Sequence, residues 1–217
     1  AASVMNFHGL PFAKAALAAS KTTDFSPDVE LSLTASPSEA QIFPGRPTTV
    51  WQYNGQVIKG DSNSLMHLDQ SHLGPIIRVH RHQKVRIHFN NNLPARSIIH
   101  WHGLHVPAKM DGHPKDVIPT GETFTYEFEV LNRAGTYWYH PHPHGRTGHQ
   151  VYGGLTGLFL VTDAEEEKLN LPNEELDIPL VIQDRSFNRD NQLVYLPRGM
   201  HDSMTGMLGD IICVNGR

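Results

Sequence analysis

Short apolar runs with the period of a β-strand are the feature that most constrains the fold of this chain. Residues 84–90 alternate, so that one face carries Val85, Ile87 and Phe89. Residues 123–130 alternate in the same way, with an apolar face formed by Phe124, Tyr126, Phe128 and Val130. Further apolar runs occupy residues 48–53, 97–104, 136–139 and 155–162. Glycine, proline and asparagine clusters separate the runs, and helical periodicity is almost absent. The pattern predicts an all-β fold, an antiparallel β-sandwich.

The distribution of these runs predicts how the chain is divided. Residues 1–44 are rich in Ala, Ser, Thr and Pro, and we expect an irregular N-terminal arm there. Residues 45–163 would form one sandwich domain, in which the Asn54-Gly55 pair is expected to be the turn that ends the first strand. Residues 164–176 are acidic and polar, which predicts a linker with one helical turn at residues 165–168. Strands at 177–183 and 210–214 would begin a second domain, incomplete within residues 177–217 because two strands cannot form a sandwich alone.

Charge and cysteine content narrow the classes of function. The formal net charge is −4 and no basic run is present, so we expect no nucleic-acid partner. Cys213 is the only cysteine, so no disulfide can form within the chain. We expect Cys213 to be a small buried apolar residue. No apolar run reaches the length of about 18 residues that a membrane span needs, so we expect no membrane partner. A chain without an initial methionine suits a mature protein whose export leader was removed, and we expect a periplasmic or secreted location.

Histidine is the unusual component, with 15 residues, and four of them form two His-X-His pairs. These are His100-Trp101-His102 and His140-Pro141-His142, and each follows a strand-like run. In an extended backbone, residues i and i+2 point to the same face about 6.5 Å apart. Two such strands side by side would bring four imidazoles together as metal ligands. Imidazole suits copper, zinc, iron and nickel, so the spacing alone does not choose the metal. A zinc hydrolase would need a further ligand, and no zincin-type motif is present.

The other histidines have a simpler interpretation. A lone histidine on a strand is usually solvated or hydrogen-bonded, and this is the expectation for His8, His67, His72, His80, His82, His88, His105 and His201. Three more are candidate hydrogen-bond partners of a metal site, namely His113, His144 and His149. Trp101, Trp138 and Tyr139 are expected to pack around the site and orient its ligands. The helically spaced Met200, Met204 and Met207 are expected to fill space, with copper handling as the alternative.

Several motifs together resemble the first cupredoxin domain of three-domain multicopper oxidases, a Greek-key β-sandwich. They are Tyr53-Asn54-Gly55, Leu73-Gly74-Pro75-Ile76-Ile77-Arg78-Val79, His100-Trp101-His102-Gly103-Leu104, Met110-Asp111-Gly112, Trp138-Tyr139-His140-Pro141-His142 and Gly153-Gly154-Leu155-Thr156-Gly157. Bacterial cuprous oxidases, bilirubin oxidases and spore-coat laccases are the most similar groups. The tail, Ile182-Gln183-Asp184-Arg185 with Gly209-Asp210-Ile211-Ile212-Cys213-Val214-Asn215-Gly216, resembles the opening of their second domain. Residues 56–72 depart from the family spacing and resemble an insertion.

The resemblance implies a role for each motif residue. His100 would bind the type 2 copper of a trinuclear cluster. His102 and His140 would bind one copper of the type 3 pair, and His142 would bind the other. Asp111 would relay protons to the site, since reduction of dioxygen to water consumes protons; the alternative is a local turn role. The remaining cluster histidines and the type 1 copper would come from a C-terminal fragment or chain carrying the other cupredoxin domains.

The resemblance also implies an activity. It would be oxidation of a small reducing substrate (a phenol, an aromatic amine or a metal ion) coupled to four-electron reduction of dioxygen to water, with metals carrying the electrons. One alternative is a copper-free cupredoxin-like binding or assembly protein of the same fold, against which the four histidines argue. A second is a two-domain nitrite reductase, whose first domain would carry a cysteine copper site that residues 45–163 lack.

Overall fold

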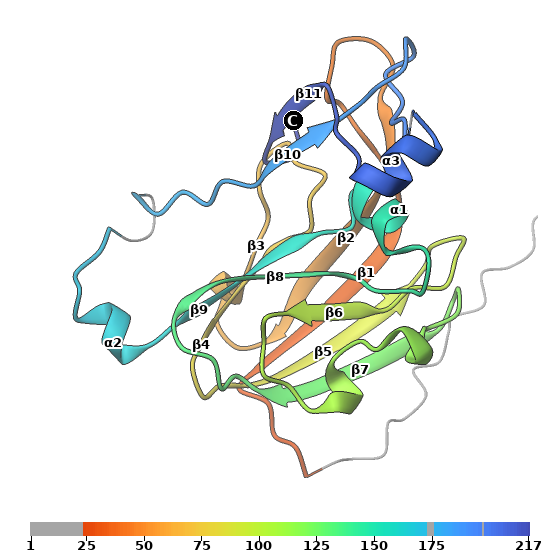
Figure 1. The fold of residues 1–217 in the computed structure, drawn as a ribbon. Helices are drawn as coiled ribbons and strands as arrows, with labels where there is room; N and C mark the ends of the chain where they lie inside the picture. The colour runs from red at the N-terminus through yellow and green to blue at the C-terminus, as the bar shows by residue number, and fades with distance from the viewer. Residues whose placement is uncertain (1–23, 173–175, 197) are drawn as a thin grey trace, which may run out of the picture.

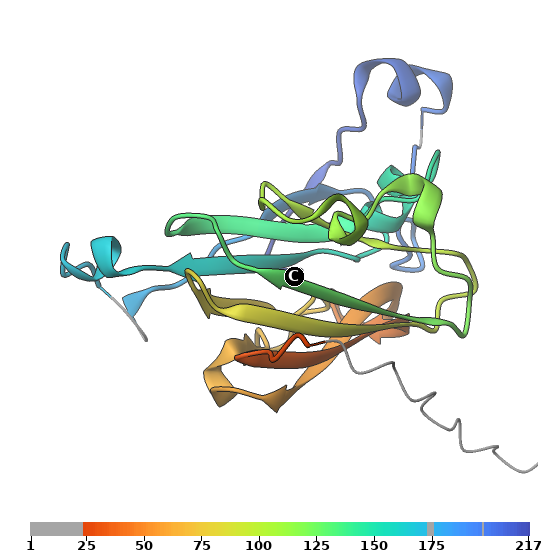
Figure 2. The same ribbon diagram turned by 90° about the horizontal axis from the view of Figure 1, so that it is seen from below.

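The computed structural model describes residues 24–172, 176–196 and 198–217, and its main body is two β-sheets packed face to face (Figures 1 and 2). Sheet A has the strand order β2-β1-β5-β7. Its strands are β1 (Val29–Ala40), β2 (Thr48–Lys59), β5 (Lys84–Asn91) and β7 (Thr123–Glu129). Within it β1 runs antiparallel to β2 but parallel to β5, and β5 pairs antiparallel with β7.

Sheet B has five strands in the order β3-β4-β9-β8-β6. They are β3 (Leu65–Met66), β4 (Ile76–His80), β6 (Ile99–His102), β8 (Gly135–Pro141) and β9 (Gly157–Thr162). β4 and β9 run parallel, whereas β9-β8 and β8-β6 are antiparallel pairs. β6, β8 and β9 coincide with the runs predicted at 97–104, 136–139 and 155–162. The all-β prediction is confirmed, but the prediction of an antiparallel sandwich is not, because each sheet contains one parallel pair, β1–β5 and β4–β9.

The core lies between the two sheets and is built by strand alternation. Val85, Ile87 and Phe89 of β5 are completely buried, as the sequence period predicts. On the neighbouring strand Tyr126 and Phe128 are buried, with Val130 just beyond its end, whereas Phe124 is partly buried against the same cluster. The largest fully buried side chain is Trp101 of β6, so this core reaches directly beneath the strand that carries the first His-X-His pair.

The prediction of an irregular arm over residues 1–44 is wrong, because β1 is an interior strand of sheet A. Its buried residues alternate from Val29 through Leu31 and Leu33 to Ala35. The serine, threonine and glutamate between them face outward, which gives the segment a polar composition although its period is that of a strand. Residues 1–23 lie outside the described residues.

The prediction of a turn at Asn54-Gly55 is also wrong, because β2 continues to Lys59 with Asn54 and Gly55 paired to β1. A Cβ atom at Gly55 would lie 2.8 Å from the Ser32 carbonyl oxygen, so glycine serves close strand approach here. The predicted insertion at 56–72 therefore contains the end of β2, the 3₁₀ turn η1 (Ser62–Ser64) and β3.

The later residues form a separate antiparallel pair of strands, β10 (Ile182–Arg185) and β11 (Ile211–Val214). β10 begins later than the predicted strand at 177–183, and residues 177–181 are irregular.

The short helices are α1 (Thr147–Tyr152), α2 (Ala164–Glu167) and α3 (Met200–Thr205), with 3₁₀ turns η2 (Ala108–Met110) and η3 (Pro114–Asp116). α2 supplies the predicted helical turn, capped by the Asp163 carboxylate. In the described part of the chain no helix has the length and apolar character needed to cross a membrane.

Candidate metal centre

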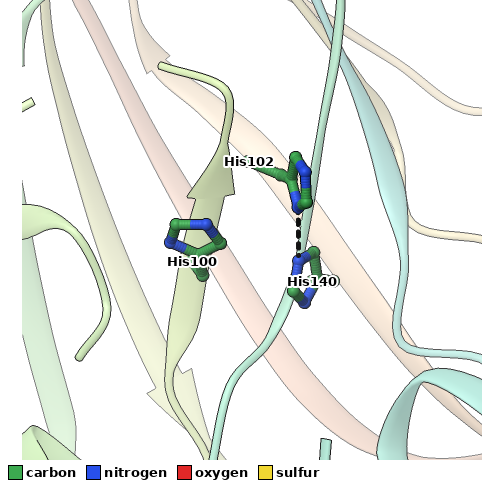
Figure 3. A group of neighbouring side chains, drawn as sticks. All are labelled: His100, His102 and His140. Carbon is green, nitrogen blue, oxygen red and sulfur yellow. Dashed lines mark hydrogen bonds between the residues drawn. The ribbon is translucent and has the colours of Figure 1, made fainter. Parts of the chain in front are cut away.

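The pairing of β6 with β8 brings the two His-X-His pairs together. His100 lies opposite His140 in the ladder, and His102 lies opposite Trp138. Because side chains alternate across a strand, His100 and His102 leave the sheet on one face while Trp101 enters the core on the other. Figure 3 shows the two β6 imidazoles and that of His140 facing one another.

Three of the imidazoles are close enough to share metal ions. One ring nitrogen from each of His100, His102 and His140 lies within 4.8 Å of the other two. The shortest approach joins His102 Nδ1 and His140 Nε2, at 3.1 Å (Figure 3). The ring of His142 is centred 5.4 Å from that of His100 and 6.0 Å from that of His140, so the fourth predicted histidine joins the cluster.

Backbone carbonyls orient two of these rings. His100 Nδ1 donates to the Asp111 carbonyl oxygen at 2.7 Å, and His140 Nδ1 donates to the Pro141 carbonyl oxygen at 2.9 Å. In a neutral imidazole, a donor at Nδ1 leaves Nε2 with a free lone pair, which is the form that binds metals. Burial, together with the neighbouring imidazoles, lowers the pKa of His140 to about 4, although the bond to Pro141 opposes the shift. This ring is therefore neutral at physiological pH.

The Met110-Asp111-Gly112 turn places Asp111 beside His100. The Asp111 Oδ1 atom lies 3.3 Å from His100 Nδ1, farther away than the carbonyl oxygen of the same residue. Gly112 has a φ of +75°, and a Cβ atom there would overlap the Ile99 carbonyl, so only glycine allows this turn to approach β6. The sequence pointed to the Asp111 side chain, whereas the structure shows that its backbone oxygen makes the shorter contact.

Aromatic side chains border the cluster as predicted. Trp138 stacks on His102 with ring centres 5.0 Å apart and lies 4.2 Å from His140. Tyr139 points to the opposite side of β8, where its hydroxyl donates to the Pro75 carbonyl at 2.7 Å. Trp101 packs against Tyr139 and the core aromatics, so the residues between the ligands anchor both strands.

The three histidines predicted as hydrogen-bond partners of the metal site do not contact it. His113 and His144 are exposed, and His149 packs edge-on against Trp51 and Tyr195. Among the described residues, no hydrogen bond joins any of the three to the four clustered rings. The structure therefore does not support their prediction as hydrogen-bond partners of the site.

Most of the remaining histidines are hydrogen-bonded or solvated, as predicted. His105 is exposed, and hydrogen bonds are formed by His67, His80, His82, His88 and His201. His8 lies outside the described residues. His72 contradicts the prediction, because only 4% of this residue is exposed. The Gly154 and Gly216 backbones lie against its ring, a burial that the lone histidine in the sequence does not indicate.

Two further predictions concern the end of the chain. Cys213 is 2% exposed, which confirms it as a buried residue. Met200 and Met204 are 79% and 80% exposed, so the expectation that they fill space is wrong. Helical spacing indicated a shared face, but α3 turns that face to solvent.

The donor set fits a copper ion cluster. Imidazole nitrogens are typical ligands of copper, and two of the rings already present a free nitrogen toward the others. His142 Nδ1 is buried and has no hydrogen-bond partner within the described residues. A buried nitrogen without a partner is expected where a metal ion or another group binds. Within the described residues, no carboxylate joins this group of ring nitrogens.

Comparison with known proteins places the chain in a family. The family model described as multicopper oxidase matches residues 35–166. A multicopper oxidase of Staphylococcus aureus is 38% identical over 161 residues, which are 73% of this chain and 35% of that protein. The cell division protein FtsP of Sodalis glossinidius is 33% identical over 174 residues, covering 79% of this chain and 33% of that protein. A multicopper oxidase crystal structure from Aquifex aeolicus has a TM-score of 0.73 and 39% identity, and the match covers 88% of this chain and 39% of that one.

The chain thus spans about a third of the length of the curated relatives it matches. The likeness in structure confirms the predicted cupredoxin β-sandwich. With more than half of its residues matched by one family model, and a solved oxidase sharing its fold, the chain belongs to the multicopper oxidase family.

Proposed function

We propose that His100, His102, His140 and His142 supply half of the ligands of a trinuclear copper cluster. The observation that carries this proposal is the pairing of β6 with β8, which sets His102 Nδ1 and His140 Nε2 3.1 Å apart and groups all four rings. Two nitrogens at this separation, from different strands, suit two ligands of one metal ion. His100 would hold the type 2 copper, His102 and His140 one type 3 copper, and His142 the other.

The three copper ions of the cluster and the type 1 copper would together supply the four electrons that reduce dioxygen to water, while one-electron oxidation of a phenol, an aromatic amine or a metal ion replenishes them. The residues of this chain hold, orient and enclose the site. The Asp111 and Pro141 carbonyls fix two imidazoles, and Trp138 covers one side of the group. The Asp111 carboxylate, 3.3 Å from His100 and partly exposed, would pass protons from solvent to the site.

The other ligands and the type 1 copper would come from residues outside this chain, in a C-terminal fragment or chain. The β10–β11 ladder supports this partner. Ile182 is 69% exposed and Ile212 is 67% exposed, an apolar surface suited to burial against further cupredoxin strands. Both strands of this ladder also have an edge that is unpaired within the described residues.

Elemental analysis and oxygen uptake test the proposal. The assembled protein should bind several copper ions, and His102→Ala or His142→Ala should abolish oxygen consumption while a reducing substrate still reduces the type 1 copper. Full activity with stoichiometric zinc and no copper would refute it.

A copper-free binding or assembly function is the second candidate, favoured by the likeness to a relative named as a cell division protein. The grouping of His100, His102 and His140, with the His142 ring beside them, favours the oxidase, because a binding protein has no need of such ligands. The two functions differ in metal content. A protein that folds, remains free of copper when copper is supplied, and consumes no oxygen would establish the second candidate.

A further inference from the structure

We infer that Gln150 is a positioning residue that holds His142 in the cluster. For copper binding this inference rests on the proposed function, but the position of His142 can be tested without metal. His142 differs from the other three histidines because β8 ends at Pro141. His100, His102 and His140 are fixed by the ladder between β6 and β8, whereas His142 lies one residue beyond it.

No side-chain hydrogen bond orients the His142 ring either. Its Nδ1 atom is buried without a partner among residues 24–172, 176–196 and 198–217. His100 and His140, in contrast, donate from Nδ1 to backbone carbonyls. Apart from the contacts of its ring with His100 and His140, His142 is held within the described residues by one backbone bond, of 3.3 Å from its N–H to the Ile98 carbonyl.

Gln150 connects the loop that follows His142 to the residues next to Ile98. It lies in α1, is completely buried, and uses both ends of its side-chain amide. Its Oε1 accepts from the Ser97 hydroxyl at 2.8 Å, and its Nε2 donates to the Arg96 carbonyl at 3.0 Å. The loop from His142 to Gln150 is thus fastened at both ends to residues 96–98, which lead into β6.

The anchoring segment is itself rigid. Ser97 is completely buried and pairs with Ile118 through two backbone hydrogen bonds of 3.0 and 2.7 Å. The backbone N–H of Ile99 donates to the buried hydroxyl of Tyr126 at 2.9 Å. Residues 96–99 therefore fix β6 on one side, and through Gln150 they fix the loop of His142 on the other. One segment sets the spacing between the two His-X-His motifs.

Without the Gln150 amide, the loop would keep its internal hydrogen bonds from the Arg146 N–H and the Thr147 hydroxyl to the Pro143 carbonyl. Within the described residues, however, only the 3.3 Å bond of His142 would still tie it to residues 96–98. The His142 ring would then occupy more than one position, while the three ladder histidines would keep theirs. Residues that orient metal ligands typically contribute about 10- to 100-fold in metal affinity or activity. The copper ion assigned to His142 should be the one affected.

The test compares Gln150→Met, which keeps the length of the side chain and removes both hydrogen bonds, with Gln192→Met. Gln192 is a matched control, since its side-chain amide also uses both ends: Oε1 accepts from the Thr49 N–H at 3.0 Å and Nε2 donates to the Pro47 carbonyl at 2.9 Å. None of these partners belongs to the loop of His142 or to residues 96–99. If Gln150→Met does not fold, Ser97→Ala removes one of the two bonds and should act in the same direction more weakly.

Three measurements decide the matter: crystal structures of the metal-free variants, copper content, and the fraction of copper detected by electron paramagnetic resonance. Gln150→Met should displace or split the His142 ring, lower copper affinity about 10- to 100-fold, and raise the detected fraction as the coupled type 3 pair is broken. Gln192→Met should lower the free energy of unfolding without these changes. An unmoved His142 with parent copper content and spectrum would overturn the inference. If the parent binds no copper, the proposed function fails, and the metal-free structures still decide the position of His142.

Discussion

His72 should make the stability of this protein fall as the pH drops below neutrality. Its imidazole is 4% exposed and packs against the backbones of Gly154 and Gly216. Neither ring nitrogen forms a hydrogen bond of ordinary geometry with the described residues. Burial, together with the nearby Arg185 guanidinium, lowers the pKa of His72 to about 4, although the Gly216 backbone opposes the shift.

The size of the effect follows from the two protonation equilibria. An unfolded chain would bind a proton at His72 near pH 6.5, whereas the folded protein resists doing so until about pH 4. Between these values the unfolded state carries more protons, so this contribution to stability is complete above pH 6.5 and is lost as the pH falls toward 4. The loss should reach about 2 kcal/mol between pH 7 and pH 5, and about 3 kcal/mol below pH 4.

Urea unfolding at pH 7 and pH 5 measures this difference. His72→Met replaces the ring with an apolar side chain of similar reach and removes the titrating group. The variant should lose about 2 kcal/mol less than the parent over this interval. Equal losses in parent and variant would refute the argument that His72 is buried in its neutral form.

Three further predictions test the architecture around the site. Gly112→Ala should lower the free energy of unfolding by about 1–3 kcal/mol or more in urea titrations, and more than Gly121→Ala, whose φ is also positive but which has open space. Tyr139→Phe should cost about 1–3 kcal/mol by leaving the Pro75 carbonyl without its donor, whereas Tyr53→Phe should cost little, because the Tyr53 hydroxyl has no partner in the described part of the chain. Asp111→Asn should slow reoxidation by dioxygen in stopped-flow measurements without changing copper content; an unchanged rate would leave Asp111 only its turn role.

The sequence was sufficient for the strands whose period is unambiguous. β5 and β7 alternate without interruption, and both were predicted within one residue of their observed bounds. β1 alternates as well, but its serines, threonine and proline gave it the composition of a loop. Asn54-Gly55 has the chemistry of a turn, yet pairing with β1 keeps it extended, which local sequence cannot show.

The four clustered histidines were predictable because strand alternation is local and the motif repeats. The groups that orient these histidines could not be predicted, because they are backbone carbonyls, which every residue carries whatever its side chain. The bond from His100 to the Asp111 carbonyl depends on the turn that brings Asp111 back to β6, and the bond from His140 to the carbonyl of the next residue depends on the backbone conformation at the end of β8. Gln150 was missed for the same reason, since its partners lie more than fifty residues earlier in the chain.

The two parallel strand pairs limit the order in which this domain can fold as it is synthesised. β1 must wait for β5, and β4 must wait for β9, so both sheets close through pairings between distant segments, which form slowly. β6 belongs to its sheet only through β8, which in turn lies against β9. The ladder that groups the four imidazoles therefore joins the rest of sheet B only when residues up to 162 have entered the fold. Copper would then enter a domain that is already folded, and it would not be the nucleus around which the chain condenses.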